Sequence, residues 1–516
     1  MKKSKIYLFT LLSIFIAQVN FSQTTTNYGT NSGTQGAQSS FFGYNAGRDN
    51  VADYNSFFGY QAGLYTTTGE ANVFFGTSTG LNNTTGSRNV FLGHYAGYSN
   101  TTGNKNVFVG MYSGQKNTVA QYNTFLGYDA GHENLAGDNS FIGAYSGSVN
   151  TTGTNNAFFG AFSGQNNTIG DNNTFVGESS GKNNTEGSYN TFIGSNAGIN
   201  NTTGSLNVFL GTNSGFENTT GERNVFIGHQ TAITNTSGYK NVFVGFYSGR
   251  KNTTGNQNVF IGDYSGYENT TGYGNVFLGE SSGAENTTGE GNIAIGPWSG
   301  NLNTTGMHNV TMGASAGYRN VSGSGNVLLG YNAGFNTLGS DNVFIGWKAG
   351  YNETGSGKLY IDNTDTSTPL IYGNFSTDQL GINTNVIPTG YAFAVKGKMI
   401  AEELKIQVFP WSDFVFEAGY DLPTLAEVEA FIKTHGHLMD IPNAQEVAEN
   451  GIELGDMNAK LLQKIEELTL YTIQQEKHIE QLEQNNLELK EQIKDLKDQD
   501  QRIQKLEHAI NAINKN

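Results

Sequence analysis

Ser412 and Asp413 stand next to each other, and two histidines, His435 and His437, follow within the same segment of the chain. A serine becomes a nucleophile only when a base lies beside it, and histidine is the usual base. Nothing in the spacing brings either histidine to the serine, and no Ser-His-Asp or paired-carboxylate pattern recurs elsewhere. We therefore expect no catalytic site, and these four residues are the weak candidates for one.

Metal ligands would have to recur in the Gly-rich middle of the chain. Asp129, Asp171 and Asp263 are scattered there and form no column of the kind that calcium-binding repeats have. The chain has no cysteine, which removes thiolate zinc sites and thiol nucleophiles. We expect no metal site and no cofactor.

The stretch Asn-Thr-Thr-Gly occurs nine times, first at Asn83 and last at Asn303. Its composition predicts a solvated turn, because Gly supplies a positive φ and Asn can bond its own backbone. Two other interpretations are a stacked threonine row that orders water, as an ice-binding face does, and a glycosylation acceptor.

Aromatic side chains follow many of the glycines that close a repeat. They could stack on sugar rings, but stacking on one another along the repeats is the favoured interpretation. These residues are Tyr60, Tyr95, Tyr112, Tyr145, Phe162, Tyr247, Tyr264, Trp298 and Trp347.

The net charge limits the partners that we expect, and the N-terminal residues indicate the cellular compartment. The 516 residues carry a net charge of −16 with no basic stripe, which excludes nucleic acid as an expected partner. Three lysines precede an apolar run, Ile6 to Ala17, and this predicts a cleaved signal peptide over residues 1–22. A non-cleaved anchor is the alternative. No other segment is apolar enough to span a bilayer, so we expect a secreted or cell-surface protein associated with the outer membrane.

The middle of the chain repeats the unit Asn-Val-Phe-Ile-Gly every 17 or, occasionally, 16 residues. Nineteen copies close on glycines from Gly43 to Gly346. A short fixed period predicts a solenoid, in which each unit buries its apolar face against its neighbours. The apolar triplet, for example residues 259–261, predicts one short strand per coil. We predict a parallel β-roll of 19 repeats over residues 38–354 in a mainly β protein.

Two positions within the repeat indicate which faces of the strand are apolar. The residue two before the closing glycine is Phe in sixteen of nineteen copies, failing at Ala294, Thr311 and Leu328, and the next residue is always apolar. Because adjacent strand residues point to opposite faces, both faces are apolar. A lone solenoid needs only one dry face, so we expect copies of the same chain to cover the other, most simply in a trimer. The residues predicted to pack or oligomerise here include Phe91, Phe108, Phe226, Phe260 and Phe277.

The unit Asn-Val-Phe-Ile-Gly with its following Ser/Ala-Gly step resembles the Asn-Ser-Val-Ala-Ile-Gly repeats in the head of trimeric autotransporter adhesins. The resemblance covers about residues 38 to 352 and implies a left-handed parallel β-roll that trimerises. The unit here is longer than the family's usual one, and Phe stands where the family has Ala. These differences imply a different packing at the trimer axis.

Beyond the repeat the pattern changes twice. Residues 355–408 alternate like short strands and predict a β-rich neck, with a last pair of strands over residues 392–406. Residues 409–457 follow as a connector domain. In it, Thr424 with Glu427 three residues on predicts a capping box that starts a short helix through Lys433.

A heptad pattern runs over residues 458–516 and predicts an α-helical coiled coil. Ile at a and Leu at d favour a dimer, against the trimer expected from the roll, but polar a positions specify the number of strands weakly. The d positions are Leu461, Leu468, Gln475, Leu482, Leu489, Leu496, Ile503 and Ile510, and the a positions are Ile465, Thr472, Ile479, Asn486, Ile493 and Asp500. The residues expected to carry oligomerisation are Leu468, Ile479, Leu482, Leu489 and Leu496.

Residues 411–475 resemble the C-terminal domain of secreted fibre-like proteins of the Bacteroidetes and, with it, the intramolecular chaperone domain of phage tail spikes and endosialidases. Those domains assemble as trimers, and many cleave themselves with a serine nucleophile that a basic residue assists. The family's cleavage motif has Arg and Lys after Ser-Asp, whereas Phe414, Val415 and Phe416 follow here. The resemblance therefore implies a retained assembly domain, with self-cleavage near Ser412 as the alternative.

These expectations describe a structural and interaction protein rather than an enzyme: an exported, rod-like, trimeric surface adhesin or fibre. Its partners would be its own copies and glycans or proteins on host or neighbouring cells. A fibre that cleaves itself is the alternative. An ice-binding protein and a phage tail fibre are further alternatives, and the signal peptide disfavours the last because phage fibres assemble in the cytoplasm.

Overall fold

A computed structural model describes residues 26–407 and 411–514 of the chain. The signal peptide predicted over residues 1–22 lies outside the described residues. The chain divides between Lys398 and Met399 into two compact units, each of which is described by itself.

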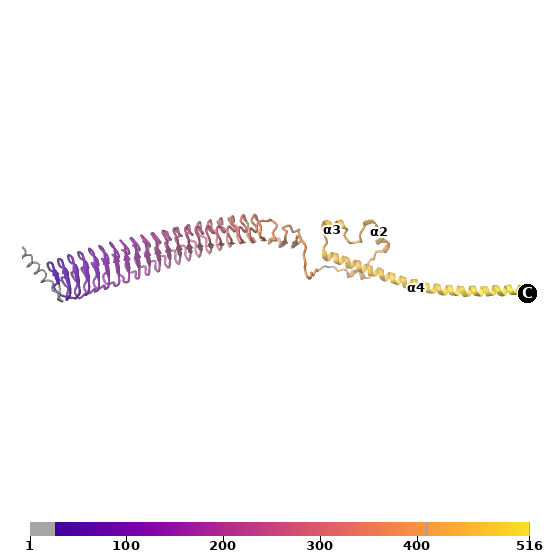
Figure 1. Cartoon of the computed structure of the whole chain (residues 1–516), viewed down its shortest axis with the longest axis horizontal. Helices are drawn as coiled ribbons and strands as arrows, with labels where there is room; N and C mark the ends of the chain where they lie inside the picture. The colour runs from indigo at the N-terminus through magenta and orange to yellow at the C-terminus, as the bar shows by residue number, and fades with distance from the viewer. Residues whose placement is uncertain (1–25, 408–410, 515–516) are drawn as a thin grey trace, which may run out of the picture. The chain divides into compact units, whose positions relative to one another are not determined.

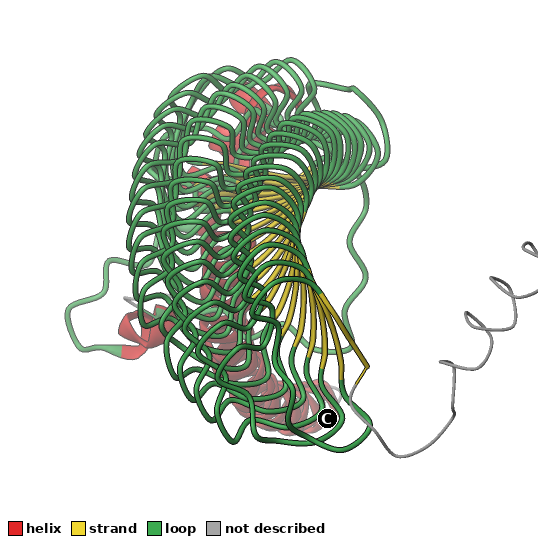
Figure 2. Cartoon of the chain, turned by 90° about the vertical axis from the view of Figure 1, so that its left-hand side faces the viewer, coloured by secondary structure: helices red, strands yellow, loops and turns green. Residues whose placement is uncertain are grey.

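The first unit is a parallel β-solenoid with one three-residue strand in each coil (Figure 1). Successive strands pair in parallel and in register, so that Phe260 lies beside Phe277 and Ile261 beside Leu278. Figure 2 shows the strands gathered in one sheet along one side of the stack, while turns make up the rest of each coil. The predicted β-roll is confirmed, and its nineteen units are the strands β2 to β20.

The strands of the solenoid have these bounds: β1 Thr26–Tyr28, β2 Ser40–Phe42, β3 Ser56–Phe58, β4 Val73–Phe75, β5 Val90–Leu92, β6 Val107–Val109, β7 Thr124–Leu126, β8 Ser140–Ile142, β9 Ala157–Phe159, β10 Thr174–Val176, β11 Thr191–Ile193, β12 Val208–Leu210, β13 Val225–Ile227, β14 Val242–Val244, β15 Val259–Ile261, β16 Val276–Leu278, β17 Ile293–Ile295, β18 Val310–Met312, β19 Val327–Leu329 and β20 Val343–Ile345.

The stack is longer than the repeat at both ends. β1 pairs in parallel with β2, and β21 (Lys358–Ile361) pairs in parallel with β20. The coil geometry therefore continues past residue 354, where the repeat was predicted to end. The sequence signal fades there because Tyr360 takes the place of the buried Phe.

The predicted neck holds three further strands: β22 (Ile371–Asn374), β23 (Gln379–Ile382) and β24 (Phe393–Val395). β22 is antiparallel to both β21 and β23, and β24 is parallel to β23. The prediction of a pair of strands over residues 392–406 is wrong in its second half. Residues 398–407 form no strand, since no neighbouring strand pairs with them, and Ile400 is 98% exposed.

A column of phenylalanine rings fills the interior of the solenoid. Phe260 and Phe277 are at most 1% exposed, and their ring centroids lie 4.8 Å apart at an interplanar angle of 7°. The Ser-Gly step makes room for each ring: Gly266 has φ +59, and a Cβ there would lie 2.5 Å from the ring of Phe260. Phe91, Phe108, Phe226, Phe260 and Phe277 therefore pack inside the coils, and the outward-facing side chains are their strand neighbours.

The second unit is helical. It contains the 3-10 helix η1 (Ser412–Phe416) and the helices α2 (Leu425–His435), α3 (Ala444–Asn450) and α4 (Leu454–Ile513). The capping box of Thr424 and Glu427 is confirmed, although the helix ends two residues beyond Lys433, and Asn443 with Glu446 forms a second box at α3. Within residues 26–407 and 411–514, no helix is both long and apolar enough to cross a membrane.

Candidate interaction surfaces

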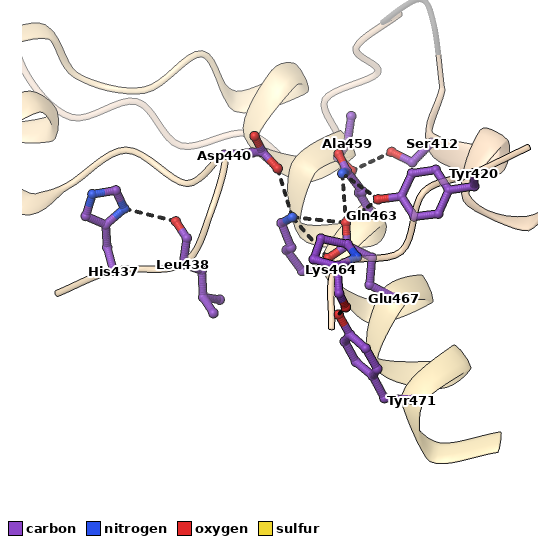
Figure 3. Close-up of polar contacts among 11 residues, drawn as sticks. Ser412, Tyr420, His437, Leu438, Asp440, Ala459, Gln463, Lys464, Glu467 and Tyr471 are labelled. Carbon is purple, nitrogen blue, oxygen red and sulfur yellow. Dashed lines mark hydrogen bonds and ion pairs between the residues drawn. The ribbon is translucent and has the colours of Figure 1, made fainter. Parts of the chain in front are cut away.

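Ser412 is a structural link in the second unit (Figure 3). Its hydroxyl is buried and donates a hydrogen bond of 2.5 Å to the backbone oxygen of Ala459, which attaches η1 to α4. Asp413, beside it, is exposed. The hydroxyl is thus engaged with a backbone oxygen that cannot take its proton.

The structure does not bring the candidate histidines to Ser412. His435 stacks on Phe431 with centroids 4.1 Å apart, and Nδ1 of His437 lies 2.9 Å from the backbone oxygen of Leu438. Among the described residues, no hydrogen bond joins either histidine to Ser412. The four candidate residues do not form one site in this arrangement.

A polar network holds residues 423–440, here called the arm, against α4 (Figure 3). Nζ of Lys464 lies 2.9 Å from Asp440 of the arm and 3.0 Å from Glu467, and the hydroxyl of Tyr471 donates to the backbone oxygen of Pro423. Burial alone would lower the pKa of Lys464, but hydrogen bonds to the two carboxylates outweigh it and leave that pKa raised. The arm is attached to α4 at both of its ends.

The seam of α4 is uncovered in the chain. Leu468, Ile479, Leu482, Leu489 and Leu496, the side chains predicted to carry oligomerisation, are 46–63% exposed. The helix predicted over residues 458–516 is confirmed as far as Ile513, and residues 515–516 lie outside the described residues. Its assembly into a coiled coil stays a prediction.

Two columns of buried asparagines run through the solenoid, and the sequence analysis missed both. In the strand ladder, each asparagine that precedes a strand receives a backbone N–H from the next coil; the distance from Asn275 N to Asn258 Oδ1 is 2.9 Å. In the turn ladder, the asparagines of the Asn-Thr-Thr-Gly turns bond one another, as Asn269 Nδ2 does to Asn252 Oδ1 at 2.7 Å. The available signal was the recurrence of Asn at fixed positions of the repeat.

The prediction that Asn-Thr-Thr-Gly is a solvated turn is therefore wrong for its asparagine. Asn252 is 0% exposed, whereas Thr254 of the same turn is exposed. The hydroxyl of the first threonine, Thr253, donates 3.0 Å to the backbone oxygen of Thr270 in the next coil. A glycosylation enzyme cannot reach a side-chain nitrogen that lies inside the coil, so the folded turn is no acceptor.

The outward side of the sheet is largely apolar: the residue after each ring position is apolar in all nineteen coils, and the residue before it is apolar in all but six, where it is Ser or Thr. We call it the outer strip and define it as the strand residues on either side of each buried ring. Val73, Val90 and Val107 are 38–43% exposed on one side, and Phe75, Leu92 and Ile261 are 41–56% exposed on the other. The prediction of two apolar strand faces is confirmed: one face is filled by the phenylalanine column, and the other is exposed in the chain.

Several of the aromatic residues behind the closing glycines stack along the solenoid, whereas Tyr247 and Tyr264 meet edge to face. Ring centroids lie 5.9 Å apart for Tyr95 and Tyr112, 5.3 Å for Tyr145 and Phe162, and 6.4 Å for Tyr331 and Trp347.

Two of the three scattered aspartates, Asp171 and Asp263, accept hydrogen bonds from backbone N–H groups. Oδ1 of Asp171 accepts hydrogen bonds from the N–H and the hydroxyl of Thr154, and Asp263 accepts one from the N–H of Phe246. In the described part of the chain, no three His, Asp or Glu side chains converge in a way that could hold a metal ion.

The surfaces that stand out are the outer strip and the seam of α4 with its arm. Comparison of the chain with models of protein families, with curated proteins and with solved structures found no match.

Proposed function

We propose that the chain is the subunit of an exported, trimeric rod at the cell surface, where it acts as an adhesin or fibre. The observation that carries the proposal is the outer strip, in which the residue after the ring position is apolar and at least partly exposed in all nineteen coils. The seam of α4 supports the same conclusion from the second unit. Both surfaces lack a cover within one chain and suit self-association.

The size of the outer strip argues for a partner rather than for a tolerated patch. Nineteen strands at about 4.8 Å spacing, each about 10 Å long, give a surface of roughly 900 Å², which is apolar except at the six coils whose strand begins with Ser or Thr. Monomeric proteins rarely expose contiguous apolar patches beyond a few hundred Å². Leaving such a surface in water would disfavour a solitary chain.

A second copy is the partner that matches the strip in length and in repeat. Identical solenoids present the same coil spacing, so their strips can stay in register from end to end. Three copies can close around one axis with every strip covered. This arrangement also agrees with the resemblance of the repeat to trimeric adhesin heads.

The adhesive role is supported by what the assembly would leave outside. Turns with exposed threonines, such as Thr254 and Thr271, and partly exposed rings, such as Tyr264, repeat along the coils. Many copies of a weak contact on one rod bind a cell surface by avidity. Glycans or proteins on host or neighbouring cells are the ligands that such a surface suits.

Light scattering on the purified protein tests the assembly. The expected mass is three times that of one chain, which is 55.6 kDa before loss of a signal peptide. A monomer at micromolar concentration would contradict the proposal. The adhesive role is tested separately by comparing attachment of cells that do and do not produce the protein, and equal attachment would contradict it.

A matched pair of double variants tests the outer strip itself. Ile261→Asp with Leu278→Asp places two charges on the strip and should lower the thermal stability of the oligomer while leaving the coil intact by circular dichroism. Thr254→Asp with Thr271→Asp places the same charges on exposed turns of the same region and should change little. Equal effects of the two pairs would contradict an interface at the strip.

A further inference from the structure

An apolar hollow of about 510 Å³ lies between the arm and α4. Leu425 and Val428 of α2 line it on one side, and Leu461, Ile465 and Leu468 line it on the other. We call it the arm hollow. The charged groups at its rim, Lys464 and Glu467, are already paired with each other, so the hollow favours an apolar occupant over a charged one.

The arm is held by polar contacts at its ends and not by packing along its length. In the described helix α2 no residue is fully buried, and Leu425 is 52% exposed. A short helix with an apolar side usually depends on packing for its stability. The arm therefore has an unfilled apolar side that faces α4 across the hollow.

The α4 side of the hollow belongs to the heptad seam. Leu461, Ile465 and Leu468 occupy d, a and d, and the same series continues along α4 with Ile479 and Leu482. A helix that packs along this seam in a coiled coil follows it over the whole length. It must then pass through the arm hollow at the N-terminal end of the seam.

We infer that the arm hollow holds the α4 helix of a second copy of this chain, placed in parallel and in register. This inference rests on the proposed self-association and adds where the copies meet. In that arrangement the neighbouring α4 presents its own Leu461, Ile465 and Leu468 to the hollow. The arm then contacts the e positions of that helix, Leu462 and Thr469, because the arm stands on the g side of its own helix, at Lys464 and Tyr471.

The arm hollow adds apolar contact at the level of α4 where the seam becomes polar. Directly after the hollow, the seam carries Thr472 at a and Gln475 at d, and Asn486 and Asp500 follow at later a positions. Such polar positions lower the stability of the seam, and the long uniform repeat of the solenoid offers no single register of its own. A contact between the arm and the neighbouring α4 at one level of the helix holds the copies in a single axial register.

Cysteine cross-linking tests the inference, because the chain has no cysteine of its own. Two differently tagged full-length chains are produced together, one with Val428→Cys on the arm and the other with Thr469→Cys at the e position. A disulfide needs Cα atoms within about 7 Å. Oxidation should give a band that carries both tags, and Leu468→Cys alone should give a symmetric dimer band, as a parallel seam requires.

The matched control replaces the arm cysteine by Ala430→Cys, at an exposed position of α2 that does not line the hollow. The inference is overturned if the oligomer keeps its mass and the band from 428 and 469 is no stronger than that from 430 and 469. It is also overturned if Leu468→Cys gives no dimer, as in an antiparallel pair. A monomeric parent chain would instead contradict the proposed assembly itself, so the two failures are distinguishable.

Discussion

The side-chain nitrogen of Asn269 lies 2.7 Å from the side-chain oxygen of Asn252, one coil away, and both residues are completely buried. The same nitrogen lies 3.1 Å from the backbone oxygen of Gly272, and Asn269 in turn accepts a hydrogen bond from Asn286 at 2.8 Å. Each asparagine thus closes its own turn and joins two coils. These hydrogen bonds between buried side chains exist only while the coils remain stacked.

Replacing one member of this ladder should damage more than one coil. Asn269→Ala leaves Oδ1 of Asn252 without its donor, and one buried polar group left unpaired costs about 1–3 kcal/mol. Gly272 keeps Asn258 as a donor and Asn286 keeps the oxygen of Gly289, so we expect a local loss of about 2 kcal/mol, seen as hydrogen exchange on the order of 30-fold faster in the adjacent coils. Hydrogen exchange suits this test because a long repeat array need not unfold in two states.

The control for this substitution is Thr271→Ala in the same turn. Thr271 is exposed, so its loss should leave exchange in these coils unchanged. If the two variants exchange alike, the ladder does not contribute to stability in the way its geometry indicates.

The coil at Ala232 offers a stabilising substitution. Ala232 takes the position of the Ser-Gly glycine with φ +50, a conformation that costs a residue with a Cβ about 1 kcal/mol. The nearby ring is displaced: Phe226 and Phe243 lie 5.2 Å apart at 18°, against 4.8 Å and 7° for Phe209 and Phe226. Ala232→Gly should therefore raise the stability of this region by about 1 kcal/mol.

Thermal unfolding followed by circular dichroism measures this gain. Ala316→Gly is the matched control, because Ala316 precedes the glycine of its coil and has no positive φ. It should lose stability, since glycine only adds freedom to the unfolded chain there. A loss for both variants would show that Ala232 is not strained.

Much of the solenoid could be predicted from the sequence because its strands repeat. The apolar triplet recurs at a fixed spacing, so one coil such as residues 258–274 stands for all. The asparagine ladders could not be predicted in the same way. An asparagine in a solvated turn and Asn269 in its ladder have the same local neighbours, and only stacking brings Asn252 into contact with it.

The second unit was predictable in its helices but not in their arrangement. The capping box of Thr424 and Glu427 is a local signal, and so is the heptad of α4. The contacts of Ser412 with Ala459 and of Tyr471 with Pro423 join residues nearly fifty positions apart. No periodicity in the sequence indicates such pairs, so the sequence alone cannot distinguish a structural Ser412 from a nucleophile.

The phenylalanine column breaks at Ala294 and Thr311, where a cavity of about 10 Å³ remains between Phe277 and the next coils. Oδ1 of Asn303, which also lines this cavity, has no hydrogen-bond partner in the described chain. Ala294→Phe restores the ring of the other coils, and Gly300 has the place that Gly266 has beside Phe260, where the absence of a Cβ makes room for the ring.

We expect Ala294→Phe to stabilise the solenoid by about 1–2 kcal/mol through added apolar burial. Calorimetry of the variant against Ile293→Phe checks this, since residue 293 lies on the outer strip and gains no burial inside the coil. A loss of stability in Ala294→Phe would mean that the hydroxyl pair of Ser299 and Thr311 needs the space that the ring fills.

Glu466 should make the second unit less stable at neutral pH. Its side chain is 8% exposed, Oε2 has no partner in the described chain, and burial together with the charge of Asp413 raises its pKa. The folded unit therefore binds the proton more tightly than the unfolded chain, so stability falls as pH rises from about 4.3, the usual value, through the raised value.

Glu466→Gln should raise the unfolding temperature at pH 7 and leave it nearly unchanged at pH 4. Glu476→Gln, at an exposed position of the same helix, should do neither, and a pH-independent effect of Glu466→Gln would contradict the raised pKa.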